Sequence, residues 1–476
     1  MRSCVEPLEA LLRDGSVFQK EHAALALGNM AVCTETRKAM RSCVEPLEAL
    51  IRGGTGEQMQ NAAYALANIA CGNCDNGRAM HSCLSPLEAL VRGGTEKQKE
   101  HAAYALATIC RASKKCESSC VQALEALLRD GNEMQKRKAA LGLSAMLADG
   151  EDSVVMAYCI KPLQALVQEG SGDQREHAAY SLGLIARSSE EIKVALLSCI
   201  DPLKALLCGG TEEGKESAAF ALANFACDDN ASEMCSCIAP FKMLLCDGSD
   251  KQKEWAAYGL SNIAACLQGI RRDLCSCIAP LRTMLRAGTE KQKENAAFAF
   301  GNIAARCDYA TAEEIRMCIV SLGDLVRTGT QLQREGGAYA LAHIAYRDDY
   351  SDTKRTAMRS CIKPLETLLH SGNAMQQRFA VGALGYMAIA MGNYMRSCIE
   401  PFVKIASSGT HSEEMRGNAT LGLVHIAKAN FKNATTGAMY KCIEPLAELV
   451  RSGTNGQRRW AADALEKIAA NDEYSL

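Results

Sequence analysis

The chain has 476 residues, and its 53 lysines and arginines nearly balance 55 aspartates and glutamates, for a net charge of −2. It therefore lacks the global basic field that nucleic-acid binding uses, and we expect no nucleic-acid partner. It also lacks an apolar run near the ~20 residues of a membrane span and the pattern of a signal peptide, so we expect no membrane insertion and a location in the cytoplasm or nucleus.

A fixed internal period organises the sequence. A cysteine recurs at steps of 37 to 44 residues, and the residues around these anchor cysteines are nearly the same each time. The anchors are Cys4, Cys43, Cys83, Cys120, Cys159, Cys199, Cys237, Cys277, Cys318, Cys361, Cys398 and Cys442. Such a period predicts one continuous solenoid domain over residues 1–476 rather than several globular domains.

A helix is predicted to follow each anchor. All ten prolines lie three residues after an anchor, and only Ala123 and Ser321 break this rule. Proline suits the first turn of a helix and stops a preceding helix from running straight on. Apolar residues at anchor +1, +4, +7 and +8 give this second helix of each repeat one buried face. The glycine at anchor +11 is expected to form a left-handed C-terminal cap.

A third helix is predicted to start directly after that glycine. The next residue is Ser, Thr or Asn in all twelve repeats, and Gln or Glu stands three positions later in eleven, with Gly214 as the exception. This is a capping box. The helix continues with Ala-Ala-x-x-Leu-x-x-Ile-Ala, whose small residues allow close helix packing. A short segment before each anchor supplies a first helix, with an apolar residue such as Met40 or Met80 three positions before the cysteine.

Two of these segments resemble a known family. Residues 62–70 (Ala-Ala-Tyr-Ala-Leu-Ala-Asn-Ile-Ala) and 296–304 look like the third helix of armadillo repeats, and Pro-Leu-Glu-Ala-Leu looks like their second helix. The resemblance covers essentially the whole chain. It implies an all-α, right-handed armadillo α-solenoid of about twelve three-helix repeats. It identifies no single member, because the family includes nuclear-import adaptors, catenins and vacuolar scaffolds.

The two ends differ from the repeat pattern. Residues 1–4 match residues 40–43, so the chain starts inside the first repeat, and we expect the natural protein to extend further upstream. Near the other end Asp463 and Lys467 stand where other repeats have an aromatic residue and an Asn. A more polar last helix suits a terminal repeat, so residues 460–476 are expected to form a C-terminal capping helix.

Positions +17, +21 and +25 of the third helix are four residues apart and lie on one face, away from the apolar stripe. Most repeats keep the order acid, aromatic ring, amide, but repeats four and ten to twelve break it with Arg137, Ala145, Arg378, Gly382, Asp463 and Lys467. Third helices line the concave groove of an armadillo superhelix, so we expect a peptide-binding groove, mainly in repeats six to nine, with a second patch at repeats one to three. The expected groove residues are Asn29, Asn68, Asn224, Asn262, Asn302, His343, Tyr64, Tyr104, Tyr180, Phe220, Tyr258, Phe298, Tyr339, Glu216, Glu254, Glu294 and Glu335.

This ladder suits an extended peptide. Asn can donate to and accept from a peptide backbone, the rings contact aliphatic stems or cations, and Glu attracts Lys or Arg. We therefore predict a non-enzymatic protein-interaction scaffold whose ligand is a peptide segment containing Lys or Arg. Replacing Asn224, Asn262 and Asn302 by Ala should then weaken binding with little effect on melting.

Other interpretations stay open. Import adaptors have Trp where this chain has Tyr or Phe, which weakens but does not remove a role as a nuclear-import cargo adaptor. A membrane-associated armadillo adaptor is a further alternative. The rings could also simply fill space between helices, with Asn side chains bonding to the local backbone.

No pattern in the sequence indicates catalysis, a metal site or a cofactor. The pair Cys71-x-x-Cys74 has the spacing of a zinc site, but no second Cys or His pair lies near it. His22, His101 and His177 recur in register with only Glu beside them. The 24 cysteines are expected to be reduced and mostly buried, because the anchors should lie a helix-packing distance apart.

Overall fold

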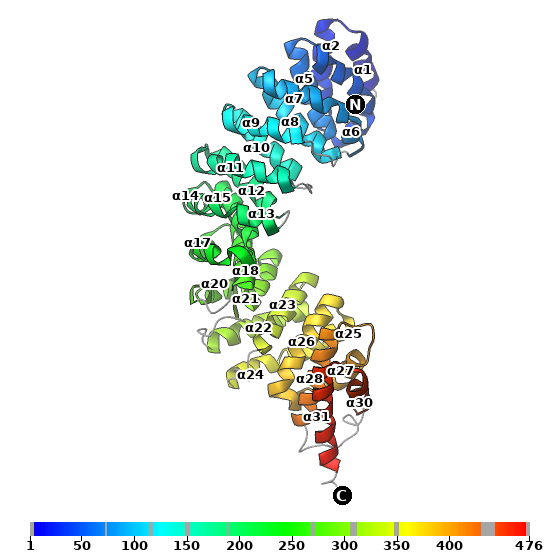
Figure 1. Cartoon of the computed structure of the whole chain (residues 1–476), viewed down its shortest axis with the longest axis vertical. Helices are drawn as coiled ribbons and strands as arrows, with labels where there is room; N and C mark the ends of the chain where they lie inside the picture. The colour runs from blue at the N-terminus through cyan, green and yellow to red at the C-terminus, as the bar shows by residue number, and fades with distance from the viewer. Residues whose placement is uncertain are drawn as a thin grey trace. The chain divides into compact units, whose positions relative to one another are not determined.

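The computed structural model describes residues 4–71, 74–113, 118–147, 153–187, 190–267, 272–304, 312–346, 352–429 and 443–472. Within these ranges the regular structure is helical throughout, without a β-strand. The chain divides into two compact units, Met1–Pro240 and Phe241–Leu476, blue to green and green to red in Figure 1. The anchor Cys442 and residues 473–476 of the expected capping helix lie outside the described ranges.

In the first unit each anchor cysteine is followed by a second helix and a third helix. The second helices are α1 (Val5–Asp14), α4 (Val44–Gly53), α7 (Leu84–Gly93), α9 (Ser118–Asp130), α11 (Ser153–Glu169) and α14 (Ile200–Gly209). The third helices are α2 (Val17–Met30), α5 (Gly56–Ala70), α8 (Glu96–Ser113), α10 (Glu133–Leu147), α12 (Gly172–Ala186) and α15 (Glu212–Phe225). Short segments precede several anchors: α3 (Thr34–Arg37), η2 (Lys38–Cys43), α6 (Cys74–Ala79), η3 (His81–Cys83), α13 (Glu190–Ala195), η4 (Leu197–Cys199), η5 (Asp228–Asn230), α16 (Ala231–Met234) and η6 (Cys235–Cys237).

The second unit repeats this order. Its second helices are α17 (Ile238–Asp247), which contains the boundary between the units, α20 (Ile278–Ala287), α22 (Ala312–Thr328), α25 (Ile362–Ser371), α27 (Ile399–Ala406) and α30 (Ile443–Ser452). Its third helices are α18 (Asp250–Cys266), α21 (Glu290–Ala304), α23 (Gln331–Tyr346), α26 (Ala374–Met391), α28 (Glu413–Ala429) and α31 (Asn455–Asp472). The shorter segments are α19 (Arg272–Cys275), α24 (Asp352–Arg359), η7 (Gly392–Tyr394) and η8 (Arg396–Cys398).

The predicted capping boxes form at most third helices. At α5 the Thr55 side chain accepts from the Gln58 amide nitrogen at 3.3 Å, and the Gln58 side chain accepts from the Thr55 nitrogen at 3.0 Å. Repeat eleven is an exception, because its third helix starts two residues later than predicted. Ser412, not Thr410, accepts from the backbone of Met415 at 3.3 Å. Met415 cannot return the bond, so the box predicted there is absent.

The capping glutamine also joins neighbouring repeats. The Gln58 side-chain nitrogen donates to the Val17 carbonyl at 2.9 Å, at the start of the preceding third helix. The same bond, between 2.8 and 3.3 Å, recurs from Gln98 to Gly56, Gln135 to Glu96, Gln292 to Asp250, Gln333 to Glu290 and Gln376 to Gln331. One side chain thus caps its own helix and fixes the register of the repeat before it.

The glycine that ends each second helix does not adopt the predicted left-handed conformation. Gly15, Gly54 and Gly94 have φ between −72° and −79° and extended ψ. Their need for glycine is steric instead. A Cβ on Gly54 would lie 2.5 Å from the Leu50 carbonyl oxygen and 2.9 Å from the Gln58 side chain. The glycine leaves room for the capping glutamine at the point where the two helices meet.

Proline separates the first and second helices in most repeats but not in all. α22 passes through the anchor Cys318 without a break, as expected where Ser321 replaces proline. α11 also passes through its anchor although Pro162 lies inside the helix, so the prediction of a break is wrong there. A proline removes one backbone hydrogen bond, a loss that the packing of α11 on α9 and α12 offsets.

The predicted apolar faces form the core. On α5 Ala62, Ala63, Leu66 and Ile69 are fully buried. The anchors that the structure describes are buried free thiols, apart from the exposed Cys4. Burial raises the pKa of Cys43 to about 12. Cys275 is disulfide-bonded, so the expectation of reduced thiols is wrong at that position.

Candidate functional site

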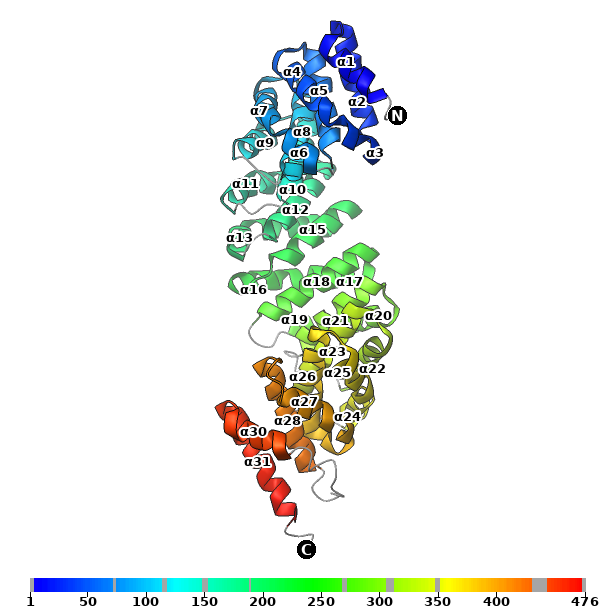
Figure 2. The ribbon, with the colours of Figure 1, turned by 90° about the vertical axis from the view of Figure 1, so that its right-hand side faces the viewer.

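Within each unit the third helices of successive repeats pack along one another, whereas their second helices touch much less. Figure 2 shows α8, α10, α12 and α15 stacked in this way. A stack that is tight on one side and loose on the other curves toward the tight side. The third helices therefore line the inner side of each unit. We call the surface formed by their +17, +21 and +25 side chains, such as Gln60, Tyr64 and Asn68, the third-helix face.

In the first unit the rings and amides of this face bond to the neighbouring repeat. The Tyr64 hydroxyl donates to Asn29 Oδ1 at 3.2 Å, and Asn68 Nδ2 donates to the Gly28 carbonyl at 3.1 Å. The Tyr64 ring lies directly on Gly28, where an added Cβ would be 2.6 Å from a ring carbon. A small residue on one helix therefore makes room for the ring of the next.

Further along the first unit some rings remain partly open to solvent and one is buried. Tyr180 is 44% exposed and stacks on Phe220, which is 5% exposed, with ring centroids 5.0 Å apart. Tyr104 is half-buried, and the Lys138 ammonium lies 5.2 Å from its ring centroid. Asn224 is 8% exposed and donates to the Phe220 carbonyl of its own helix at 2.7 Å.

In the second unit Asn302 is the most tightly held amide. It is 7% exposed, and its Nδ2 donates to the Ser261 carbonyl and hydroxyl oxygens, both at 3.1 Å. Its Oδ1 accepts the Tyr339 hydroxyl. The Tyr339 ring contacts Phe298 at 5.4 Å and His343 at 4.4 Å between centroids. One repeat earlier, Asn262 is half-buried and Tyr258 is 36% exposed.

These contacts give the two residue types different roles. Asn68 and Asn302 place their amide nitrogens on carbonyls of the preceding third helix and so join the two helices, whereas Asn224 bonds within its own helix. The rings of Tyr180 and Tyr258 are exposed and that of Tyr104 is half-buried, so these rings can contact a ligand. The sequence predicted the positions of both sets but not this division.

The carboxylates of the face are not equivalent. Glu254 and Glu294 form ion pairs with Lys251 at 2.9 Å and Lys291 at 2.5 Å. Both lysines lie three residues before their glutamates and were missed in the sequence, although that spacing is readable there. Glu216 and Glu335 make no ion pair with any described residue. Of these four carboxylates, Glu216 and Glu335 are the two whose charge no described residue neutralises.

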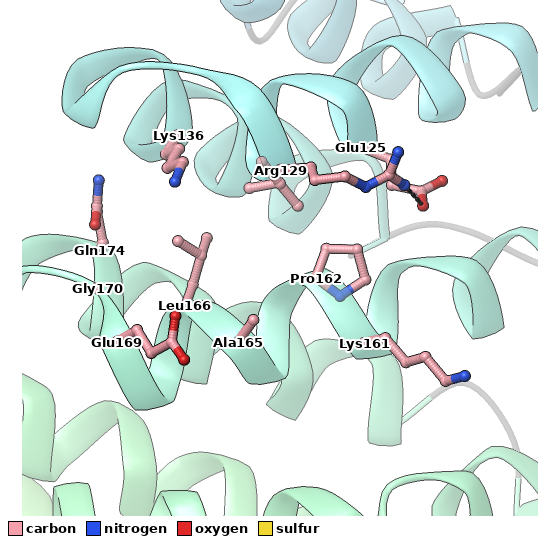
Figure 3. A pocket seen from close by; sticks show the side chains of 11 residues that line it. Glu125, Arg129, Lys136, Lys161, Pro162, Ala165, Leu166, Glu169, Gly170 and Gln174 are labelled. Atoms are coloured by element: carbon pink, nitrogen blue, oxygen red, sulfur yellow. Dashed lines mark hydrogen bonds and ion pairs between the residues drawn. The ribbon is translucent and has the colours of Figure 1, made fainter.

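Two cavities lined by described residues lie between second helices, away from the third-helix face. One of about 690 Å³ separates the second helices α9 and α11, and one of about 510 Å³ separates α1 and α4 in the same register. Figure 3 shows Lys136 and Glu169 on opposite sides of the larger one, with Leu166 between them, while Arg129 is paired with Glu125 at 2.8 Å. Both cavities are wedges left where the outer layer of the stack opens.

Over the ranges that the structure describes, no three His, Cys, Asp or Glu side chains come together in a way that could hold a metal ion. None of the described helices is long and apolar enough to cross a membrane.

Comparison with known proteins identifies the fold. No family model matches the sequence, and no curated protein matches it. Among solved structures, one reported for a phosphorylation switch that controls the interaction between cadherin and β-catenin aligns over 98% of this chain and 99% of its own, with 16% identity and a TM-score of 0.63. The chain has the armadillo-repeat fold. An engineered protein aligns with a TM-score of 0.60 and 22% identity over 89% of this chain and 98% of its own.

Designed armadillo repeat proteins also align with this chain. One was crystallised with the peptide (KR)4 and covers 48% of this chain and 99% of its own, with 22% identity and a TM-score of 0.42. That similarity is too low to support an argument about binding. The armadillo fold of this chain thus rests on the longer alignments and on the helix order described above.

Proposed function

We propose that this protein is a non-enzymatic scaffold, an armadillo solenoid of about twelve repeats that binds an extended peptide segment along its third-helix face. The observation that supports this most is the set of partly exposed rings at the same position of several third helices, including Tyr104, Tyr180 and Tyr258. Packed helices lie about 8–10 Å apart, and an extended chain advances about 3.3 Å per residue. Roughly every third residue of a ligand would pass a third helix, and a ring lies on some of these helices.

The ligand we propose contains Lys or Arg where it passes carboxylates without a local partner. Glu216 and Glu335 provide such charge, whereas Glu254 and Glu294 are already paired with lysines. Rings can hold both the aliphatic stem and the cationic end of these side chains. Protein binding by a similarly folded structure, that of the cadherin–β-catenin study, is an analogy at the level of the fold.

The test is a peptide-library screen on the full chain, followed by fluorescence anisotropy on the best binders. Replacing Tyr104 or Tyr180 by Ala should weaken binding about tenfold, the effect of losing about 1.4 kcal/mol. Met243→Ala is the matched control, because Met243 is 61% exposed but lies on the second helix α17. If the affinity is unchanged in both tyrosine variants and falls in the Met243 variant, the ligand lies on the outer surface and the proposal is rejected. Circular dichroism of each variant checks the fold.

A further inference from the structure

The helices α23 and α26 carry two aromatic pairs side by side. Tyr339 and Phe379 lie 5.1 Å apart between ring centroids at 74°, and Tyr346 and Tyr386 lie 5.0 Å apart at 86°, both edge to face. On each helix the two rings are seven residues apart, which is about two turns, so they share one side of the helix. We call these four residues and Gly382 the aromatic slot.

Gly382 is buried and places no side chain between the two pairs. It stands at the position where other repeats have a ring. An added Cβ there would meet nothing closer than Asn418 at 3.5 Å and Ala342 at 3.8 Å, which are ordinary contacts. Seven residues at 1.5 Å each place the pairs about 10.5 Å apart along the helices.

One end of the slot is apolar and open to solvent. Tyr346 is 64% exposed, and Ile389, one turn after Tyr386, is 40% exposed. Burial raises the pKa of Tyr386, and the nearby Glu414 carboxylate raises it further. That carboxylate is paired with Arg378 at 2.6 Å. A cation at this end would therefore find the nearby negative charge already neutralised.

The unpaired carboxylate on the same stripe is far away. Glu335 precedes Tyr346 by eleven residues on α23, about 16 Å along the helix. Among the residues that the structure describes, the exposed end of the slot thus offers aromatic surface and the Tyr346 hydroxyl rather than net charge. Those are the groups that recognise a neutral segment.

We propose that the aromatic slot binds a proline-rich segment in the polyproline II conformation. Such a helix repeats every three residues, or about 9.3 Å, close to the spacing of the two aromatic pairs. Its carbonyl groups have no internal hydrogen bonds and can accept from the exposed Tyr346 hydroxyl, while proline rings pack against the aromatic rings. The segment is already extended and ordered, so binding loses little conformational entropy. This inference rests on the proposed function and specifies the ligand of one part of the third-helix face.

The test uses three labelled probes on the full chain: a peptide of Ala-Pro-Pro repeats, its counterpart with every Pro replaced by Ala, and an alternating Lys-Arg octapeptide. If the proposal is right, the affinity for the proline peptide depends on Tyr346 and Gly382, and the affinity for the other two peptides does not. Tyr346→Ala and Gly382→Tyr should each weaken it about tenfold. Tyr346 is mostly exposed, so its variant should fold even if Gly382→Tyr does not. Met243→Ala, on the second helix α17 and outside the third-helix face, is the control and should leave this binding unchanged.

The outcomes separate this inference from the proposed function. Equal binding of the proline and alanine peptides, or no effect of Tyr346→Ala, overturns the slot. Loss of Lys-Arg binding in Tyr346→Ala also overturns it, because the slot would then take a cation. If library peptides bind through Tyr104 and Tyr180 while the proline peptide does not bind, the slot alone fails. If no peptide of any composition binds the chain, the proposed function fails as well.

Discussion

Replacing Asn302 by Ala should destabilise the second unit rather than only weaken ligand binding. The amide joins three repeats, because it donates to both oxygens of Ser261 on α18 and accepts the Tyr339 hydroxyl from α23. The site is buried, with Ser261 6% and Asn302 7% exposed. Water cannot replace these bonds without opening the helix stack.

The magnitude follows from the groups left without partners. A typical hydrogen bond contributes about 1 kcal/mol net, and leaving a buried polar group unsatisfied costs about 1–3 kcal/mol. Ala at this position removes two donated bonds and one accepted bond, although Tyr339 is half-buried and can turn its hydroxyl to solvent. We therefore expect a loss of about 2–3 kcal/mol in the free energy of unfolding.

Urea unfolding followed by circular dichroism measures this loss, and amide hydrogen exchange locates it. Protection should fall in α18, α21 and α23. Asn29→Ala is the matched control, because Asn29 is exposed and makes a single bond with Tyr64 at 3.2 Å. That variant should change stability by less than about 0.5 kcal/mol. Equal stability of the Asn302 and Asn29 variants would refute the view that the buried amide is structural.

Three further predictions concern the repeat unit. Gly54→Ala should cost about 1–3 kcal/mol, because its Cβ would meet a carbonyl at 2.5 Å, whereas Gly53→Ala has open space and should be neutral or slightly stabilising in thermal melts. Burial alone would raise the pKa of Glu48, but Ser82 and Arg52 hold it below its usual 4.5. The wild type should thus gain stability over Glu48→Gln above about pH 4.5 and lose that gain as the pH falls through the lowered pKa; an unchanging difference between pH 7 and 3 would contradict this. Alkylation of the native protein at pH 8, followed by peptide mapping, should modify the exposed thiols of Cys4, Cys208 and Cys246. The buried anchors, whose thiol pKa is raised, should stay unmodified: Cys43, Cys83, Cys199, Cys237 and Cys277.

Local patterns in the sequence predict most of the fold. The box formed by Thr55 and Gln58 is readable because both partners lie within one turn of one helix. The bond from Gln58 to the Val17 carbonyl spans 41 residues, and no local pattern specifies that pairing. Gly54 shows a second limit, since residue type alone does not separate a left-handed cap from a close contact. The late start of α28 was missed because Thr410, with Glu413 three residues later, matches the capping-box pattern better than Ser412 does.

The candidate site was predictable in position and less so in role. A spacing of four residues is enough to place Tyr64 and Asn68 on one face of α5. Whether an amide faces a ligand or the neighbouring helix depends on what that helix presents. Asn68 finds the Gly28 carbonyl there, a group that every residue has and that no sequence pattern marks.

The capping glutamine shows how this solenoid couples its repeats. In a linear stack each repeat is stabilised mainly by its neighbours, so the bond from one glutamine to the preceding third helix is part of the coupling itself. Two repeats lack this side chain, with Gly214 and Met415 at the position. The coupling between α28 and α31 is also weak. In other repeats the capping glutamine donates to a carbonyl of the preceding third helix, but the buried Gln457 side-chain nitrogen on α31 has no hydrogen-bond partner. Local opening in such a stack begins where neighbour coupling is lowest, which points to the start of α28.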